Sequence, residues 1–395
     1  MPKNLKPVRK PIPSELYEKF IAYFPYVCVD VFVRNPKTNE LLLLKRAGNP
    51  VKGEFWPIGG RLLLFERPEE AAVRKVFDET GLVVDSDTVR LIGIGNTLFI
   101  YGEYRHTINL TFVADLDMHQ GGWDKLDLGK GEFTEFVLIK DERDLAGLTV
   151  NRDKANINQL HYLRSHTVHP YIRKMLLESK ILNQTEPIRP TRTILSSEAT
   201  GILSPFAARK GKNRRKRNAS ALDQAALTYL FPKFQRYMPV IYIESMVAVE
   251  GKGVLLKITD EGLKPARARL TLGESIDIAA FRILREEFGD KDDKRHHVGR
   301  LGYPNSRHGQ GGLIAIDDRR IRVGRLGQEI VFIYTQSMTH NKMGNSKHYV
   351  WIKTRSELEE LHNIDAHLKE LILKSGIFDG SLKGPSNTTF YNEAH

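Results

Sequence analysis

The feature that most constrains the fold of this chain is an internal repeat. Residues 16–25, LYEKFIAYFP, align without a gap on residues 230–239, LFPKFQRYMP. Further along, EFVLIK at 135–140 aligns with HYVWIK at 348–353. The offsets between the two halves differ only by amounts that a loop absorbs. Because self-similarity at a constant offset indicates repeated structural units, we predict two copies of one domain in tandem.

The length of the chain agrees with this division. At 395 residues, it exceeds a single domain of roughly 100–200 residues. Its 41% hydrophobic and 27% charged residues are average for globular proteins, which excludes disordered and fibrous classes. We expect a first domain at 14–182 and a second at 226–380. Between them, residues 183–225 are rich in Pro, Ser, Thr and Arg, as expected of a linker.

Each copy has β-rich runs and a few helix-like segments. In the first copy, strands are expected at 27–33 and 41–45, separated by a hairpin connection at 35–39. Helices are expected at about 68–80 and at 171–182, with further strands between them. Strands mixed with a few helices, without regular alternation, predict an α+β fold or a sandwich.

The charge pattern and the absence of apolar spans bear on location and partners. Much of the net charge of +12 lies in one basic run, Arg209–Arg217. Such a run favours contact with RNA or another polyanion, and it equally suits a solvated linker. The lone Cys28 agrees with a reducing compartment. No apolar run approaches the roughly 20 residues that span a bilayer, so we expect a cytoplasmic protein without membrane contact.

The segment with the most specific chemistry is residues 59–82, GGRLLLFERPEEAAVRKVFDETGL. Pro68 suits the first turn of a helix, and Gly81 suits the position just after a helix end. The segment therefore predicts a glycine-rich loop, a helix and a tight turn.

The carboxylates of this segment are expected to gather when the loop folds back on the helix. Glu66 would approach Asp78 and Glu79, and clustered carboxylates repel unless a cation lies among them. Hard oxygen ligands suit Mg²⁺, which completes its shell with water and substrate phosphate. The alternative is an amphipathic surface helix, with ion pairs from Arg74 to Asp78 and from Lys75 to Glu79.

This segment resembles the Nudix box, in which G, five residues, E and seven residues precede R-E-U-x-E-E-x-G-U, with U aliphatic. The matching residues are Gly60, Glu66, Arg74, Val76, Glu79, Gly81 and Leu82, with Asp78 as a conservative replacement. Lys75 departs from the pattern, because most of the family has a metal-binding glutamate there. The missing glutamate, the LLLLKR and GEFWPIGGR runs before the box, and Asp30 are similar to the GDP-mannose mannosyl hydrolase branch.

The resemblance implies two α/β/α sandwich domains and hydrolysis of a nucleoside diphosphate linked to another group, most readily a nucleotide sugar. It implies Mg²⁺ or Mn²⁺ as cofactor. Glu79 would be the main metal ligand, and Glu66, Asp78 and a backbone carbonyl of Gly60 would bind or position the ion. Arg74 would orient the carboxylates.

Further site residues follow from the same resemblance. Arg46 and Arg61 match arginines that stabilise a leaving diphosphate. The mannosyl hydrolase branch has a histidine base in a later loop, where this chain has Phe133 preceded by Glu132. Glu132 or Glu135 is therefore the candidate metal ligand or general base.

Three residues outside the box are candidates for substrate contact. Asp30 lies in the first strand, where the resemblance places a substrate-binding residue. His106 would contact a diphosphate, or would be an ordinary hydrogen-bonded strand residue. Trp56 would stack on a base, or would fill the core beneath the box.

The second copy keeps only part of the box. Its matching residues are Glu274, Arg282, Glu286, Glu287 and Gly289. Ala268 stands in place of the box glycine and Ile283 in place of the glutamate, and the loop before the box is shorter. We therefore predict a degenerate, inactive site that binds a ligand or completes a dimer-like interface.

Two other functions and one architectural expectation follow. The chain could remove pyrophosphate from RNA 5′ ends, held by its basic run, or could sense nucleotides without turnover. We also expect the two copies to form an intramolecular pseudo-dimer about an approximate two-fold axis, with a homodimer as a further option.

Overall fold

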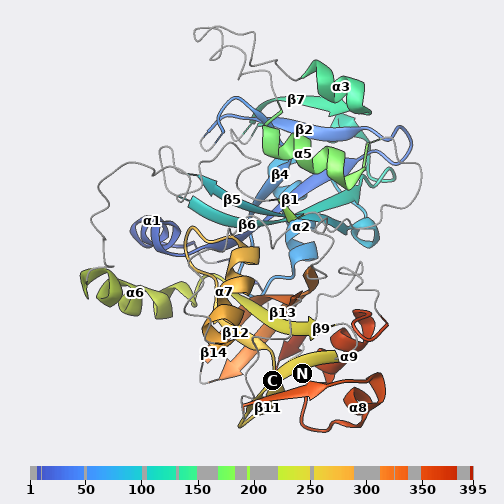
Figure 1. Cartoon of the computed structure of the whole chain (residues 1–395). Coiled ribbons are helices and arrows are strands. Elements are labelled where there is room, and N and C mark those ends of the chain that lie inside the picture. The colour runs from blue at the N-terminus through green and yellow to red at the C-terminus, as the bar shows by residue number, and fades with distance from the viewer. Residues whose placement is uncertain are drawn as a thin grey trace, which may run out of the picture. The chain divides into compact units, whose positions relative to one another are not determined.

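A computed structural model describes most of both halves of the chain (Figure 1). The described residues are 7–9, 11–48, 51–99, 105–129, 133–148, 168–182, 194–195, 221–249, 253–288, 312–323, 325–336, 348–379 and 392–394. They fall into two compact units, Lys3–Pro239 and Val240–His395. The basic run Arg209–Arg217 lies outside the described residues. None of the helices that the structure describes is long and apolar enough to cross a membrane.

The sheet of the N-terminal unit is built around β1 (Tyr26–Arg34). This strand is rich in Val, Phe and Tyr and is buried along most of its length, as in a central strand. The order is β3-β2-β1-β6-β5-β8, with β4 paired to β1 and β7 to β2. The other strands are β2 (Leu41–Arg46), β3 (Phe55–Trp56), β4 (Ile58–Arg61), β5 (Arg90–Phe99), β6 (Arg105–Asp115), β7 (Phe133–Ile139) and β8 (Ile194–Leu195).

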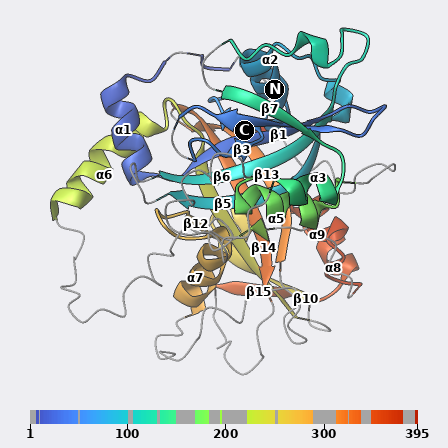
Figure 2. The ribbon, with the colours of Figure 1, turned by 90° about the horizontal axis from the view of Figure 1, so that it is seen from above.

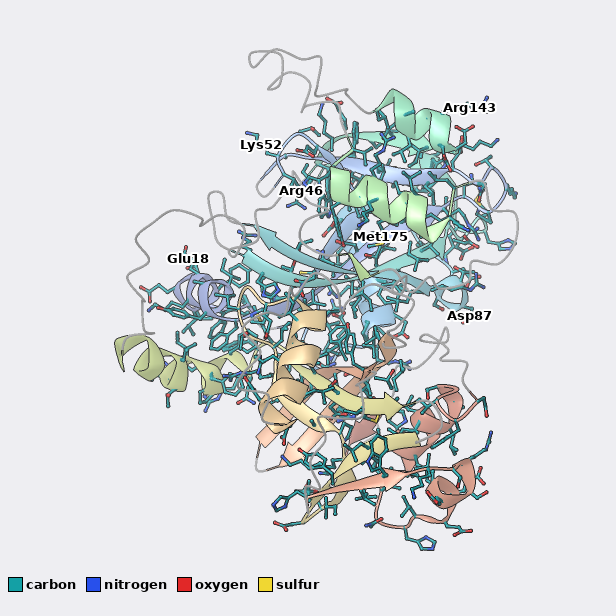
Figure 3. The ribbon with its side chains drawn as sticks, in the orientation of Figure 1. Glu18, Arg46, Lys52, Asp87, Arg143 and Met175 are labelled. Atoms are coloured by element: carbon teal, nitrogen blue, oxygen red, sulfur yellow. The ribbon has the colours of Figure 1, made fainter. Side chains whose placement is uncertain are left out.

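Helices cover both faces of this sheet (Figure 2). The helix α2 (Pro68–Thr80) contacts β1, β4 and β6, whereas α5 (Pro170–Ser179) contacts β5. Met175 of α5 (Figure 3) is fully buried in the main hydrophobic core. That core also contains Phe32, Leu41, Leu43, Trp56, Tyr171 and Ile172. The remaining short elements are η1 (Ser86–Thr88), η2 (Trp123–Lys125) and α3 (Glu142–Gly147).

The C-terminal unit repeats this plan. Its order is β11-β10-β9-β14-β13-β16, with β12 paired to β9 and β15 to β10. The strands are β9 (Val240–Val249), β10 (Gly253–Thr259), β11 (Gly262–Lys264), β12 (Ala266–Arg269), β13 (Gly312–Val323), β14 (Arg325–Gln336), β15 (Tyr349–Ile352) and β16 (Asn392–Ala394). The helices are α7 (Ile276–Phe288), α8 (Arg355–Glu360) and α9 (Ala366–Lys374). The predicted fold class, two α+β domains in tandem, is confirmed.

One buried contact shows how closely the two units correspond. In the N-terminal unit, the hydroxyl of Tyr171 on α5 packs directly against Gly95 of β5. At the aligned positions of the C-terminal unit, Nε2 of His367 on α9 lies 3.4 Å from Oδ2 of Asp317 on β13. Glycine leaves room for the large tyrosine, and the smaller histidine lies beside the aspartate carboxylate. The same helix-to-sheet contact is thus made with two different, complementary pairs.

The boundary between the units differs from the expected one. We expected the second domain to begin at residue 226, but α6 (Ala221–Phe234) packs on α1 (Ser14–Tyr23) within the N-terminal unit. The ring centroids of Phe20 and Phe234 are 5.5 Å apart. Those of Phe24 and Phe234 are 4.7 Å apart. The expected two-fold relation between the copies stays a prediction.

Candidate active site in the N-terminal unit

The loop before α2 turns sharply at Phe65, which has a φ of 65°. A non-glycine residue in this left-handed region costs about 1–3 kcal/mol and persists only when its surroundings hold it. The side chain of Phe65 is buried. The amide of Leu63 donates to Oε2 of Glu66 at 3.0 Å, which closes the turn. At the aligned position before Glu274, the C-terminal unit has Gly273 with a φ of 77°.

Arg74 holds the carboxylate of Glu66 with two hydrogen bonds. Its Nε lies 2.5 Å from Oε1, and its Nη2 lies 2.8 Å from Oε2. The same guanidinium reaches Asp78 Oδ2 at 3.5 Å and the carbonyl oxygen of Arg61 at 3.3 Å. Burial alone would lower the pKa of Arg74, but the hydrogen bonds and charge of Glu66 raise it. Arg74 therefore ties the loop, the helix and the end of β4 together, which is the contact that its expected orienting role requires.

Glu79, in the last turn of α2, is 5% exposed. Its Oε1 forms an ion pair with the ammonium group of Lys75. The Lys75 side chain lies against Gly60, because a Cβ added there would be 2.8 Å from Nζ. Gly81, with a φ of 70°, ends the helix just beyond Glu79. The structure thus brings Gly60, Lys75 and Glu79 together, next to the Arg74–Glu66 pair.

The carboxylates of the box do not form a closed metal-binding cage in the part of the chain that the structure describes. Among the residues that the structure describes, no three His, Cys, Asp or Glu side chains converge on one position suited to a metal. Glu66 is bound by Arg74, and Glu79 is paired with Lys75. Mg²⁺ that acts on phosphates is typically bound by one or two carboxylates together with the substrate phosphates. The buried Glu79 carboxylate, with a backbone carbonyl of Gly60, fits that kind of partial shell.

Asp30 lies on β1 beside Gly59, on the opposite side of the sheet from Lys75. It is 3% exposed, and its Oδ2 accepts a hydrogen bond from Asn109 Nδ2 at 2.7 Å. Asn109 in turn accepts from Thr107 at 2.6 Å. Burial raises the pKa of Asp30 to about 6, although hydrogen bonds from Asn109 and Trp56 counteract it. A Cβ at residue 59 would collide with Oδ1 of Asp30, so only glycine leaves room for this buried carboxylate.

The buried Asp30 predicts a pH-dependent stability. Because its pKa is about 6 in the folded state and about 3.9 in unfolded chains, the folded state binds more protons between these values. The contribution of Asp30 to the free energy of unfolding therefore falls as pH rises from about 4 to 6, by about 3 kcal/mol. Asp30→Asn removes this titration. We expect the stability of the variant relative to wild type to rise by that amount between pH 4 and pH 7.

Guanidinium unfolding of both proteins across this pH range measures the difference directly. The difference in free energy of unfolding between the variant and wild type is free of the effects of other titrating groups. One such group is His106, because burial lowers its pKa to about 3. A stability difference that is constant from pH 4 to pH 7 would contradict the raised pKa of Asp30.

His106 and Trp56 lie in the interior of the unit. His106 is 1% exposed, and its Nε2 is 2.8 Å from Asn96 Oδ1. Trp56 stacks on Tyr171, with ring centroids 5.6 Å apart and 24° between the planes. These positions agree with the structural alternatives stated for both residues. The predicted substrate contacts of His106 and Trp56 stay predictions.

The two predicted arginines lie at strand ends near the box. Arg46 is half-buried at the end of β2 (Figure 3), and its positive charge lowers the pKa of Asp30. The guanidinium carbon of Arg61, at the end of β4, lies 6.0 Å from the ring centroid of Tyr17. Burial lowers the pKa of Arg61. Both positive charges are therefore placed on elements that border the box loop.

The candidate base residues lie on or next to β7. Glu132 falls outside the described residues. Glu135 is described, and its Oε1 lies 2.9 Å from Nζ of Lys45 on β2. This ion pair fixes Glu135 at a largely exposed position.

In the C-terminal unit, the corresponding box carboxylates are neutralised by the chain itself. Arg282 binds Glu274, with Nε 2.7 Å from Oε1, as Arg74 binds Glu66. Glu287 is bound by Nζ of Lys257 at 2.6 Å and by the hydroxyl of Tyr349. Although partial burial would raise the pKa of Glu287, these two hydrogen bonds lower it below its ordinary value.

The position aligned with Gly59 is also filled in the C-terminal unit. Arg267 stands there, with its guanidinium carbon 4.0 Å from the ring centroid of Tyr242. It forms ion pairs with Glu329 and, at 3.6 Å, with Glu244, the residue aligned with Asp30. The inactivity of the second site stays a prediction.

Sequence reasoning did not identify the polar network beneath Asp30. Thr107 and Asn109 alternate with apolar residues in β6, and Thr97 of β5 donates to Asn109 Oδ1 at 3.2 Å. The signal that could have found it is this alternation of polar residues in a buried strand, which places them on one face.

Comparison with known proteins agrees with this geometry. Residues 25–136 match the family model of the NUDIX domain. Over 114 residues, the chain is 41% identical to an ADP-ribose pyrophosphatase from the archaeon Methanocaldococcus jannaschii. The match covers 27% of this chain and 62% of the archaeal protein, so the chain spans less than two thirds of that relative.

Two solved structures illustrate the structural comparison. A MutT protein from Methanosarcina mazei is 22% identical, with a TM-score of 0.28, and the match covers 39% of this chain and 91% of that one. A bifunctional NMN adenylyltransferase/ADP ribose pyrophosphatase from Francisella tularensis, complexed with AMP and a manganese ion, is 17% identical, with a TM-score of 0.27. That match covers 42% of this chain and 44% of the other. The stretch of the N-terminal unit that carries the box, residues 25–136, is therefore similar to the NUDIX domain.

Proposed function

We propose that the N-terminal unit hydrolyses a nucleoside diphosphate linked to another group, with a divalent metal ion. The observation that carries this proposal is the arrangement of the box. Arg74 fixes Glu66 and the end of β4, and the buried Glu79 pairs with Lys75, whose side chain lies against Gly60. The NUDIX match over residues 25–136 supports it.

The substrate class that we propose is a nucleoside diphosphate sugar. The archaeal relative is an ADP-ribose pyrophosphatase, and ADP-ribose is itself a nucleoside diphosphate joined to a sugar. ADP-ribose is therefore the first compound to test. The resemblance to GDP-mannose hydrolases rests on short sequence runs, so GDP-mannose is the second.

Different residues of the N-terminal unit would bind the metal ion and the diphosphate. A metal ion, held by Glu79 and a backbone carbonyl of Gly60, would polarise the phosphoryl group and lower the pKa of bound water. Asp78 and Glu66 would position it. Arg46 and Arg61 would offset the negative charge of the diphosphate.

A substrate panel tests the proposal. The full chain would be incubated with ADP-ribose, GDP-mannose and a dinucleoside diphosphate, each with Mg²⁺, Mn²⁺ or EDTA, and products would be separated by chromatography. We expect turnover of at least one nucleoside diphosphate sugar, lost in EDTA. Turnover confined to 5′-triphosphorylated RNA would instead favour the RNA function, and binding of nucleotide without turnover would favour a sensor.

A further inference from the structure

Glu79 and Glu287 occupy aligned positions in the last turns of α2 and α7, and each is paired with a lysine of its own unit. In the N-terminal unit the lysine is Lys75, one turn earlier on the same helix. In the C-terminal unit it is Lys257, from strand β10. The residue aligned with Lys75 there is the buried Ile283. The aligned carboxylates of Glu79 and Glu287 are thus each paired with a lysine, but the two lysines come from different elements of the fold.

The Lys75–Glu79 pair is not an ordinary surface ion pair. On an exposed helix, a lysine one turn before a glutamate is the weaker of the two orders. Here the Lys75 side chain is 17% exposed and that of Glu79 is 4% exposed. The ammonium also lies against the backbone at Gly60, where a side chain larger than hydrogen would displace it. Glycine at 60 therefore leaves the space in which a cation sits beside Glu79.

A divalent ion bound beside Glu79 would have to share this space with the ammonium. Two cations at one carboxylate repel each other, so Lys75 weakens metal binding there. A carboxylate at residue 75 would have the opposite effect, because it would add oxygen ligands next to Glu79 that a second ion could use.

We propose that the ammonium group of Lys75 is a built-in cation of the N-terminal site, which takes the place of a second divalent ion beside Glu79 and leaves room for the one ion that the proposed function requires. The site therefore binds fewer divalent ions than its geometry could hold. This inference rests on the proposed metal-dependent function, and it concerns how many ions that function uses. Lys75 acts through Glu79, as a positioning residue.

Metal binding tests the proposal without reference to turnover. Free Mn²⁺ would be titrated against the full-length protein by electron paramagnetic resonance, which gives the number of bound ions and their Kd. The variants are Lys75→Glu, Lys75→Gln and the control Lys37→Glu, which makes the same charge change in the exposed hairpin before β2. Circular dichroism would establish that each variant is folded.

We expect Lys75→Glu to bind about one Mn²⁺ more per chain than wild type. Lys75→Gln should bind the wild-type number about tenfold more tightly, because the competing charge is gone. Lys37→Glu should match wild type. The proposal is overturned if Lys75→Glu binds no additional ion, or if Lys75→Gln binds Mn²⁺ more weakly than wild type. Absence of Mn²⁺ binding in every protein would overturn the proposed function as well, which distinguishes the two failures.

Discussion

Glu79→Gln should lower turnover of the substrate by about two to four orders of magnitude. The carboxylate is buried and is the main candidate ligand for the metal. A neutral amide binds a divalent ion far more weakly, and the metal contributes several kcal/mol to stabilising the transition state. Steady-state kcat/KM at saturating Mg²⁺ measures the effect. Activity within a factor of a few of wild type would remove Glu79 from the metal site.

Glu287→Gln is the matched control for this variant. It makes the same chemical change at the aligned position of the C-terminal unit, where Lys257 and Tyr349 already bind the carboxylate. Turnover should stay within about twofold of wild type, because the second box lacks its glycine and one glutamate, with Ala268 and Ile283 in their places. Equal losses in the two variants would show that both units are catalytic.

Arg74→Met should destabilise the N-terminal unit by about 3–5 kcal/mol. The change leaves Glu66, which is 2% exposed, as a buried charge without its bidentate partner. It also removes the link from α2 to the end of β4. For a unit of this size, the loss corresponds to a Tm lower by about 10 °C in calorimetry. Adding Glu66→Gln to Arg74→Met should recover part of it, because the unpaired charge is then gone.

A variant of the corresponding Arg282–Glu274 pair in the C-terminal unit tests whether an effect on stability also changes activity. Arg282→Met breaks the equivalent hydrogen bonds to Glu274, which is more exposed than Glu66, so its effect on stability should be smaller. It should leave turnover unchanged, whereas Arg74→Met should abolish most of it. A drop in turnover with Arg282→Met, or no change in Tm with Arg74→Met, would argue against these roles.

Much of the fold could be predicted from the sequence because it depends on local patterns. The repeat, the hairpin at 35–39 and the helix from Pro68 each follow from turn residues and hydrophobic periodicity. The strands β8 and β16 could not be found in this way. Each pairs only two or three residues in parallel with a sheet edge, and no periodicity arises over so short a run. The packing of α6 on α1 was missed because it joins residues more than 200 positions apart in sequence.

The candidate site, like the fold, could be predicted from the sequence only in part. The spacing of Glu66, Arg74 and Glu79 predicted that they would gather, since a loop and one helix carry all three. Spacing could not show that Arg74 binds Glu66 on both oxygens, or that Lys75 reaches Gly60. Those contacts depend on the tertiary position of β4 against α2. The role of Trp56 likewise depended on packing against α5, and the sequence left both alternatives open.

The most direct test of the account is product analysis in ¹⁸O-labelled water. The full chain would be incubated with ADP-ribose and Mg²⁺, and the products would be identified by mass spectrometry. Hydrolysis of the diphosphate bond predicts AMP and ribose phosphate, with one ¹⁸O atom in a phosphate group and no product in EDTA. With GDP-mannose, attack at the sugar would instead place the label in mannose. Failure of the folded, metal-loaded chain to release a product from any nucleoside diphosphate derivative would contradict the central claim that its N-terminal unit is a hydrolase.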